Sequence, residues 1–188
     1  MRSMLLLFFS IVLVSAAKAQ FEGDYPENFG TLKIGAGYTH DFPGLNGVTV
    51  SGEFSKKICN FLEGAFGVKR VQLSGYPRTA AINEYTKATT LDMLLYFLPL
   101  QSGPHTLRTG LGYSFSFYKI QRAYPVVNTD KTTSWQTQAS QGRGRGMILA
   151  WEYQYALENM PLNLGFRIAL YQAYDGITYA GPFVGWRL

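Results

Sequence analysis

The feature that most constrains this chain is an alternation of apolar and polar side chains, in stretches of about ten residues separated by turn-forming residues. A period of two is typical of a β-strand with two unlike faces, because successive side chains point to opposite sides of a sheet. Strands of about 9 to 11 residues are long enough to cross a bilayer when tilted. We predict eight strands, over residues 31–40, 48–57, 61–71, 85–98, 106–118, 147–156, 162–171 and 177–188.

Nearly all charged residues within these stretches fall on the face opposite the apolar one. An outward apolar face suits hydrocarbon, where a mid-bilayer Arg or Lys costs about 2–4 kcal/mol, whereas inward charges can pair with one another. The pattern predicts an all-β fold, an eight-stranded antiparallel up-and-down transmembrane β-barrel. Eight strands enclose only enough space for side chains, so we predict a side-chain-filled lumen. The predicted lumenal ion-pair network is Lys33, Glu53, Glu63, Lys69, Asp92, Arg108, Glu152, Arg167 and Arg187.

Within this network we expect Glu152 and Arg167 to pair, because they lie at similar heights on neighbouring strands. The main interpretation of these charges is structural. A proton or ion path is the alternative, since charge buried in a membrane is sometimes functional. Three cations, Lys56, Arg70 and Lys87, fall outside the inward register, near strand ends where a membrane interface tolerates charge.

The first nineteen residues have the organisation of a secretory signal peptide. Arg2 supplies the positive start, residues 5–14 are almost entirely apolar, and Ala17-Lys18-Ala19 forms an A-x-A cleavage site. The apolar run is shorter than the roughly 20 residues of a transmembrane helix. We therefore predict a signal peptide at residues 1–19 and the barrel at residues 20–188.

The amino-acid composition argues against a nucleic-acid partner, a metal site and a cofactor. Charged residues are 15% of the chain, against about 25% in soluble domains, and aromatic residues are also 15%. The formal charge of +5 falls to +3 without Arg2 and Lys18, and so small an excess predicts no nucleic-acid partner. A single cysteine and two separated histidines lack the spacing of metal ligands, so we expect no metal and no cofactor.

The predicted connections are short at residues 58–60, 99–105 and 157–161, and longest at residues 119–146. Short periplasmic turns and longer outer loops are the outer-membrane pattern, which would place the C-terminus in the periplasm. The long segment is a candidate basic outer loop for lipopolysaccharide phosphates, since Arg forks suit phosphate; a solvated mobile loop is the alternative. Its cations are Lys119, Arg122, Lys131, Arg143 and Arg145. In the last strand we expect a bulge at Pro182.

These features resemble the small eight-stranded outer-membrane β-barrel proteins of Gram-negative bacteria, the OmpA transmembrane domain and OmpX-like class, and the glycine-rich strands resemble barrels of the Bacteroidota. The resemblance covers residues 20–188 and includes the ending Trp186-Arg187-Leu188, which is similar to the signal read by the barrel-assembly machinery. Leu188 stands where phenylalanine is common, and Phe183 where glycine is frequent. The resemblance implies a multi-pass β-barrel of the cell outer membrane, with the barrel-assembly machinery as its partner during biogenesis.

Three classes of function compete. The first is a structural, surface-interaction or accessory-subunit role, in which the outer loops contact outer-membrane lipid, lipopolysaccharide or another outer-membrane protein. The second is OmpW-like transport of small hydrophobic molecules, left open by the lumenal aromatics Phe61, Tyr96, Tyr118 and Phe183. The third is a lipid A-modifying outer-membrane enzyme. Neither His40 nor His105 begins the H-x-S arrangement of the deacylases, so we expect no catalytic residues.

Overall fold

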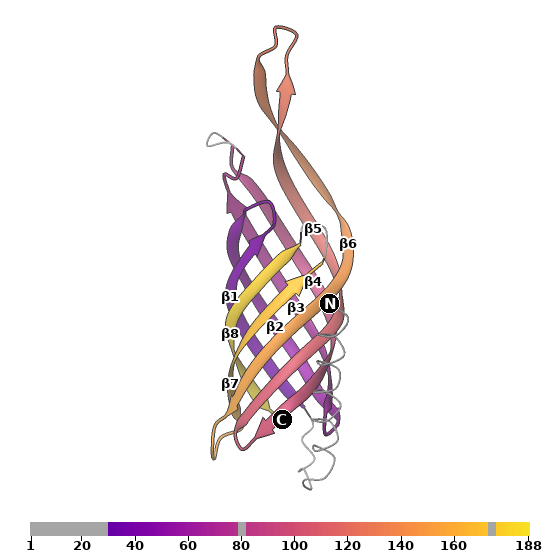
Figure 1. Cartoon of the computed structure of the whole chain (residues 1–188), viewed down its shortest axis with the longest axis vertical. Coiled ribbons are helices and arrows are strands. Elements are labelled where there is room, and N and C mark those ends of the chain that lie inside the picture. Colours follow the sequence, from indigo (N-terminus) through magenta and orange to yellow (C-terminus); the bar gives the residue numbers. More distant parts are fainter. Residues whose placement is uncertain (1–29, 79–81, 173–175) are drawn as a thin grey trace, which may run out of the picture.

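The computed structural model describes residues 30–78, 82–172 and 176–188 of the chain. Eight antiparallel strands close into a barrel, each hydrogen-bonded to its neighbours in sequence and the last paired with the first (Figure 1). The strands are β1 (Thr31–Asp41), β2 (Asn46–Cys59), β3 (Leu62–Gly75), β4 (Glu84–Ser102), β5 (His105–Val127), β6 (Thr133–Ala156), β7 (Leu162–Tyr171) and β8 (Ile177–Arg187). The predicted signal peptide, residues 1–19, lies outside the described residues. Within the described ranges, no helix is both long and apolar enough to traverse a membrane.

The predicted fold class and strand number are confirmed. β7 has its predicted bounds, and most of the other strands are longer than predicted. Closure matters physically, because hydrocarbon offers no partner for an unpaired backbone N–H or C=O, and a closed ring leaves no strand edge. The alternating faces of the sequence therefore become an inside and an outside.

The barrel has two unlike ends. At what we call the turn end, the connections are residues 60–61, 103–104 and 157–161, and the two ends of the described chain meet there, with Leu188 N donating to Gly30 O at 2.9 Å. At the loop end, residues 42–45, 76–83 and 172–176 connect strands, and the β5–β6 hairpin rises above them (Figure 1).

The prediction of a long loop at residues 119–146 is wrong. β5 and β6 continue through this segment as an antiparallel hairpin, paired in unbroken register from Gln121–Ala139 to Val127–Thr133. Residues 122–138, which we call the β5–β6 ribbon, pair only with each other, because β4 leaves β5 at Gln121 and β7 joins β6 at Ile148. The polar composition suggested a loop because, beyond Arg122 and Ala123 at its base, neither face of the ribbon is buried against a core, so the apolar alternation that marks a strand is absent.

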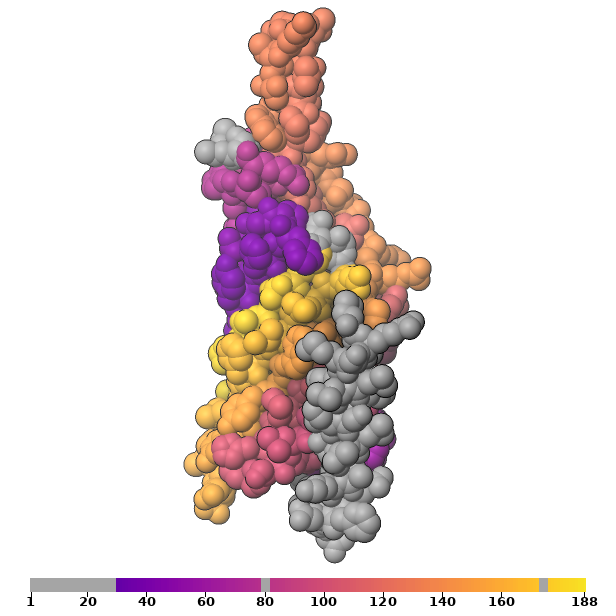
Figure 2. All heavy atoms as spheres, in the orientation of Figure 1, coloured from indigo at the N-terminus to yellow at the C-terminus, as the bar shows by residue number. Residues whose placement is uncertain are grey.

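The ribbon projects well beyond the rest of the barrel as a narrow two-stranded arm (Figures 1 and 2). At its tip, Asn128 N donates to Thr132 O at 2.8 Å, and Lys131 adopts a positive φ of 63°. The hydroxyl and the amide of Thr132 both donate to Asp130, and these hydrogen bonds lower the pKa of that carboxyl. The hairpin therefore ends in a hydrogen-bonded turn.

Large apolar side chains cover the outside of the barrel, on the faces predicted to point outward. Ile34 is 64% exposed and Leu111 is 50% exposed. Soluble monomers rarely expose apolar patches of more than a few hundred Å². This outer surface is suited to hydrocarbon. The apolar belt comprises Leu32, Ile34, Val48, Val50, Phe66, Val68, Leu91, Met93, Leu95, Leu111, Phe115, Met147, Trp151, Leu164, Phe166, Ile168, Leu170, Val184 and Trp186.

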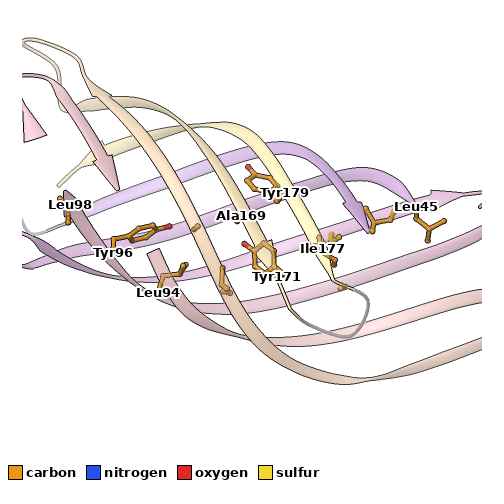
Figure 3. Close-up of a cluster of buried hydrophobic side chains, with 13 residues drawn as sticks. Leu45, Leu94, Tyr96, Leu98, Ala169, Tyr171, Ile177 and Tyr179 are labelled. Atoms are coloured by element: carbon orange, nitrogen blue, oxygen red, sulfur yellow. The ribbon is translucent and has the colours of Figure 1, made fainter. Parts of the chain in front are cut away.

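The inside of the barrel is filled by side chains from all eight strands. Buried apolar groups occupy the levels between charged ones. Figure 3 shows Tyr171 and Tyr179 pointing into the interior, with Tyr96 toward one end and Leu45 toward the other. A space of about 10 Å³ between Lys69, Tyr171 and Tyr179 is comparable to a single water molecule.

The expected bulge at Pro182 is absent. The β7–β8 register runs unbroken through the pair Phe166–Pro182, and the β1–β8 register is the same on either side of Pro182. Two glycines explain this. A Cβ on Gly37 or Gly181 would overlap the backbone of the neighbouring strand, so β1 and β8 approach closely here without an inserted residue.

A charge on the outer belt should destabilise the barrel. Leu111 pairs with Leu95 and Leu149 in the middle of the belt. We expect Leu111→Arg to lower the free energy of unfolding by about 2–4 kcal/mol, the cost of Arg at the bilayer midplane. Urea unfolding in phospholipid vesicles measures this. Thr133→Arg, on the exposed ribbon, is the control and should unfold like the parent; equal stability of the two variants would contradict the outward position of Leu111.

Gly165 should tolerate no side chain. A Cβ there would overlap the ring of Phe183 and lie 2.5 Å from the carbonyl oxygen of Tyr153. We expect Gly165→Ala to cost about 1–3 kcal/mol, the range for overpacked interiors. Gly52→Ala is the matched control, because nothing lies within 4 Å of its added Cβ. Thermal unfolding, followed by heat-modified electrophoretic mobility, should separate the two variants.

Candidate functional site

Six buried charged side chains gather in the barrel interior toward the turn end. This main ion cluster consists of three acids and three bases, Glu53, Glu63, Glu152, Lys33, Arg108 and Arg167. The strand register brings them together, because Lys33 is directly opposite Glu53 and Glu152 lies between Arg108 and Arg167 on its two neighbouring strands. The cluster is formally neutral.

Glu152 is the centre of the cluster. Its Oε2 accepts from Arg167 Nη2 at 2.6 Å and from Arg167 Nε at 2.9 Å. Its Oε1 accepts from Lys33 Nζ at 2.8 Å and from Gln154 Nε2 at 2.9 Å, and lies 3.4 Å from Arg108 Nη1. One carboxylate therefore contacts three cations from three strands, and the expected Glu152–Arg167 pair is present.

The other two acids complete a continuous network. Glu53 Oε1 lies 3.0 Å from Lys33 Nζ and 2.7 Å from Arg167 Nη2. Glu63 Oε1 accepts from Arg108 Nη1 at 2.7 Å. Since each base contacts at least two acids, removal of any one member leaves a buried charge without its full set of partners.

Two aromatic rings border this network. Lys33 Nζ lies 5.3 Å from the ring centre of Tyr96 and 5.6 Å from that of Phe183, and the Arg167 guanidinium is at similar distances. Both rings are buried, as expected for lumenal aromatics, whereas Phe61 and Tyr118 are half-buried. The cations are thus enclosed by both carboxylates and π faces.

A second charged level lies nearer the middle of the barrel. Lys69 Nζ is 2.7 Å from Asp92 Oδ2, and Ser114 Oγ donates to Asp92 Oδ1 at 2.7 Å. Lys69 also lies 4.3 Å from the ring centre of Tyr171. This level, too, pairs one acid with one base.

Near the loop end, a third level contains charges that the sequence reasoning missed or misplaced. Arg122 is inside the barrel, where its Nη2 lies 3.2 Å from Asp41 Oδ2 and donates to Thr86 Oγ1 at 3.0 Å. Its assignment to a basic outer loop is therefore wrong. Arg78 Nη1 contacts Glu84 Oε2 at 3.3 Å and donates to the carbonyl of Ala123 at 2.9 Å. These residues close the loop end of the interior.

A signal for this third level exists in the sequence. Arg122 has the same parity as inward Arg108 on β5, and Glu84 has the same parity as inward Asp92 on β4. Extending those strands by a few residues would have placed both side chains inside. The strand bounds chosen from apolar alternation ended too early, because Lys119 and Gln121, in the outward register at this end of β5, are polar and interrupt the alternation.

The remaining predicted residues lie elsewhere. Arg187 is at the rim of the turn end, where it donates to the carbonyls of Leu157 and Met160, outside the main ion cluster. Lys131 is at the ribbon tip. Lys119, Arg143 and Arg145 point outward from β5 and β6. The five proposed loop cations therefore divide among the interior, the tip and the outer wall.

The two histidines occupy opposite ends of the barrel. His40 Nδ1 is 2.8 Å from Asn46 Oδ1, and His105 Nδ1 is 2.7 Å from the Tyr153 hydroxyl. His105 also packs against the ring of Tyr155. Among the described residues, no three His, Cys, Asp or Glu side chains gather as metal ligands.

Comparisons with known proteins support the fold. No protein-family model matches the chain, and no curated protein matches its sequence. Among solved structures, the attachment invasion locus protein Ail of Yersinia pestis matches with a TM-score of 0.52 at 10% identity, over 87% of this chain and 100% of Ail. Neisserial surface protein A matches with a TM-score of 0.50 at 14% identity, over 85% of this chain and 97% of that protein. This chain has the fold of the small outer-membrane β-barrels.

Neutralising Glu152 should destabilise the barrel strongly. Glu152→Gln preserves the side-chain size but leaves three bases facing two acids in the main ion cluster. We expect a loss of about 3–5 kcal/mol in the free energy of unfolding, the usual cost of removing one partner from a buried ion pair. Glu158→Gln removes the same charge from an exposed turn and should change it by less than about 0.5 kcal/mol. Urea unfolding in vesicles compares them; equal losses would refute the central role of Glu152.

Proposed function

We propose that this chain is an integral outer-membrane protein that acts through its outer surface, as a surface-interaction protein or an accessory subunit, and not through its lumen. The apolar belt and the fold support insertion in an outer membrane. Its loop end faces the cell exterior and its C-terminus the periplasm, in keeping with the short turns at the other end. Assembly into the membrane would use the barrel-assembly machinery.

The filled interior supports a structural role for the lumenal charges. Four acids, Glu53, Glu63, Asp92 and Glu152, are matched there by four bases of the first two levels. A small hydrophobic molecule would have to displace these pairs and leave charges unpartnered in a low-dielectric interior. A water-filled path would need space that the packed side chains occupy. We therefore favour a surface role over OmpW-like transport or an ion path.

Catalysis is also not favoured. The two histidines contact Asn46 and Tyr153 and lie at opposite ends of the barrel. A lipid A-modifying enzyme needs a nucleophile beside its base. The contacts of these two histidines favour a structural role instead, in which each ring holds two neighbouring strands together at a rim of the barrel.

The observation that carries the proposal is the β5–β6 ribbon. It extends past the barrel as a hydrogen-bonded hairpin, and its two edges differ. The β5 edge is short and contains Pro125, whereas the β6 edge from Thr133 to Gln141 contains no proline and no charged residue. Proteins usually protect free strand edges with such residues, and an unprotected edge is a template for a strand of a partner. We propose that a partner protein binds along this edge.

Trimming the ribbon should abolish partner contact and spare the barrel. Arg122 and Gln138 are directly paired, so residues 123–137, which include most of the proposed edge, can be replaced by an Asn-Gly turn that suits a two-residue hairpin. A photoreactive amino acid at Gln138 should crosslink a discrete protein in outer membranes of cells carrying the intact chain. In the trimmed chain that product should disappear, while heat-modified mobility still reports a folded barrel.

The same photoreactive group at Val50, on the apolar belt, is the control and should crosslink lipid. If Gln138 yields no protein product in the intact chain, or if the product persists after trimming, the ribbon is not the partner-binding element.

A further inference from the structure

The outer wall formed by β3, β4, β5 and β6 changes character near the loop end. Directly paired residues form rows across these four strands, about 7 Å apart along a strand because two residues rise about 3.3 Å each. Toward the loop end, successive rows contain Phe66, Met93, Tyr113 and Met147; then Val68, Leu91, Phe115 and Arg145; then Arg70, Thr89, Phe117 and Arg143; then Gln72, Lys87, Lys119 and Gln141. An apolar wall becomes cationic within three rows.

Five outward cations meet here, and we call them the cationic wall. They are Arg70, Lys87, Lys119, Arg143 and Arg145. Among the described residues, no ion pair satisfies any of the five. The acids of β3 to β6 within the barrel, Glu63, Glu84, Asp92 and Glu152, are all buried in the interior. The wall therefore presents concentrated positive charge, and none of the carboxylates of β3 to β6 lies on the same outer face.

Neighbouring side chains hold two of the guanidinium groups against the wall. Arg70 Nη1 donates to Thr89 Oγ1 at 2.7 Å, and the Arg143 guanidinium lies 5.8 Å from the ring centre of Phe117. Each guanidinium carries five N–H donors, so most remain available to an anion. An open hollow of about 430 Å³ lies between them, bordered by Lys87 and Lys119.

The cationic wall is confined to one side of the barrel. At the loop end, the outward residues of β1 and β2 include Tyr38, His40, Asn46 and Val48, and the described outward residues of β7 and β8 there include no Lys or Arg. A general requirement for charge at a membrane surface would distribute cations around the circumference. Their concentration on four adjacent strands, around a hollow, indicates a binding site.

We infer that the cationic wall binds the phosphate groups of a phosphorylated glycolipid in the outer leaflet, with the lipid's acyl chains against the apolar rows below. This rests on the proposed insertion with the loop end outward. Arg forks match phosphate oxygens in pairs, and Lys adds point charges. A free anion would need only the cations. The adjoining rows of Val68, Leu91 and Phe115 provide the apolar surface that an acyl chain would cover.

The hollow has the volume of an ordinary small-ligand site, which suits a sugar phosphate headgroup. Four strands contribute to it, and the successive pairing of β3 with β4, β4 with β5 and β5 with β6 brings its lining residues, from Arg70 to Arg143, side by side. Residues 122–138 of the ribbon do not line this hollow, and the proposed partner edge meets it only at Gln141, so lipid binding is separable from partner binding along residues 133–140.

The test uses the mature full-length chain in phosphatidylcholine nanodiscs containing diphosphorylated lipid A, with native mass spectrometry and titration of the bound lipid. Lys119→Gln/Arg143→Gln should weaken lipid A binding by roughly 30-fold, from the loss of two interfacial cations. The matched control, Lys56→Gln/Lys57→Gln, removes two cations of β2 near the turn end and should bind like the parent. Arg143→Lys, which keeps the charge but loses the fork, should fall between.

Two further arms distinguish the ligand. Dephosphorylated lipid A should bind the parent chain at least as weakly as lipid A binds the double variant, which keeps three of the five cations, and inorganic phosphate at millimolar concentration should not displace lipid A. Equal binding by the test and control variants, retention of dephosphorylated lipid A, or displacement by inorganic phosphate would each overturn the inference. Heat-modified mobility in the same discs reports insertion, so failure of the proposed membrane location would be seen separately as an unfolded parent chain.

Discussion

The three-way contact of Glu152 with Lys33, Arg108 and Arg167 is the interaction on which the barrel interior depends. Those bases come from β1, β5 and β7, so a single carboxylate joins strands on different sides of the ring. Charges of this kind are expensive to remove from water, and each is retained only because opposite charges and donors surround it. Their alignment therefore requires the correct register of several strands at once, and a one-residue slip would expose them to lipid.

Size complementarity works alongside charge. The Tyr96 ring occupies the space beside Gly110, and the Phe183 ring that beside Gly165, so that large and small residues of facing strands fill the ring together. The same rings pack against Lys33 and Arg167. The interior is consequently a packed core of polar and aromatic groups, which explains why a barrel of this size offers little space for a passing solute.

Because paired charges and packed rings fill the described interior, both proposals place function on the outer surface. We propose that the β5–β6 ribbon offers unpaired backbone to a protein and that the cationic wall offers donors to anionic lipid. The two features share β5 and β6, yet they differ in chemistry, because one uses main-chain groups above the barrel and the other uses side chains beside the apolar belt. A lipid bound to the wall would lie at the base of the arm and would help to hold β5 and β6 at the membrane surface.

The sequence by itself determined the number of strands, the face on which most side chains of the predicted strands lie, and the inward position of the charges in the main ion cluster. These follow from a period of two within each strand, which is a local property of the chain. Tertiary structure decided which charges meet, that residues 119–146 form a hairpin, that Arg122 turns inward to Asp41, and that cations of four strands converge on one wall. Those outcomes depend on the stagger between neighbouring strands and on where pairing ends, and neither is encoded in the alternation of any one segment.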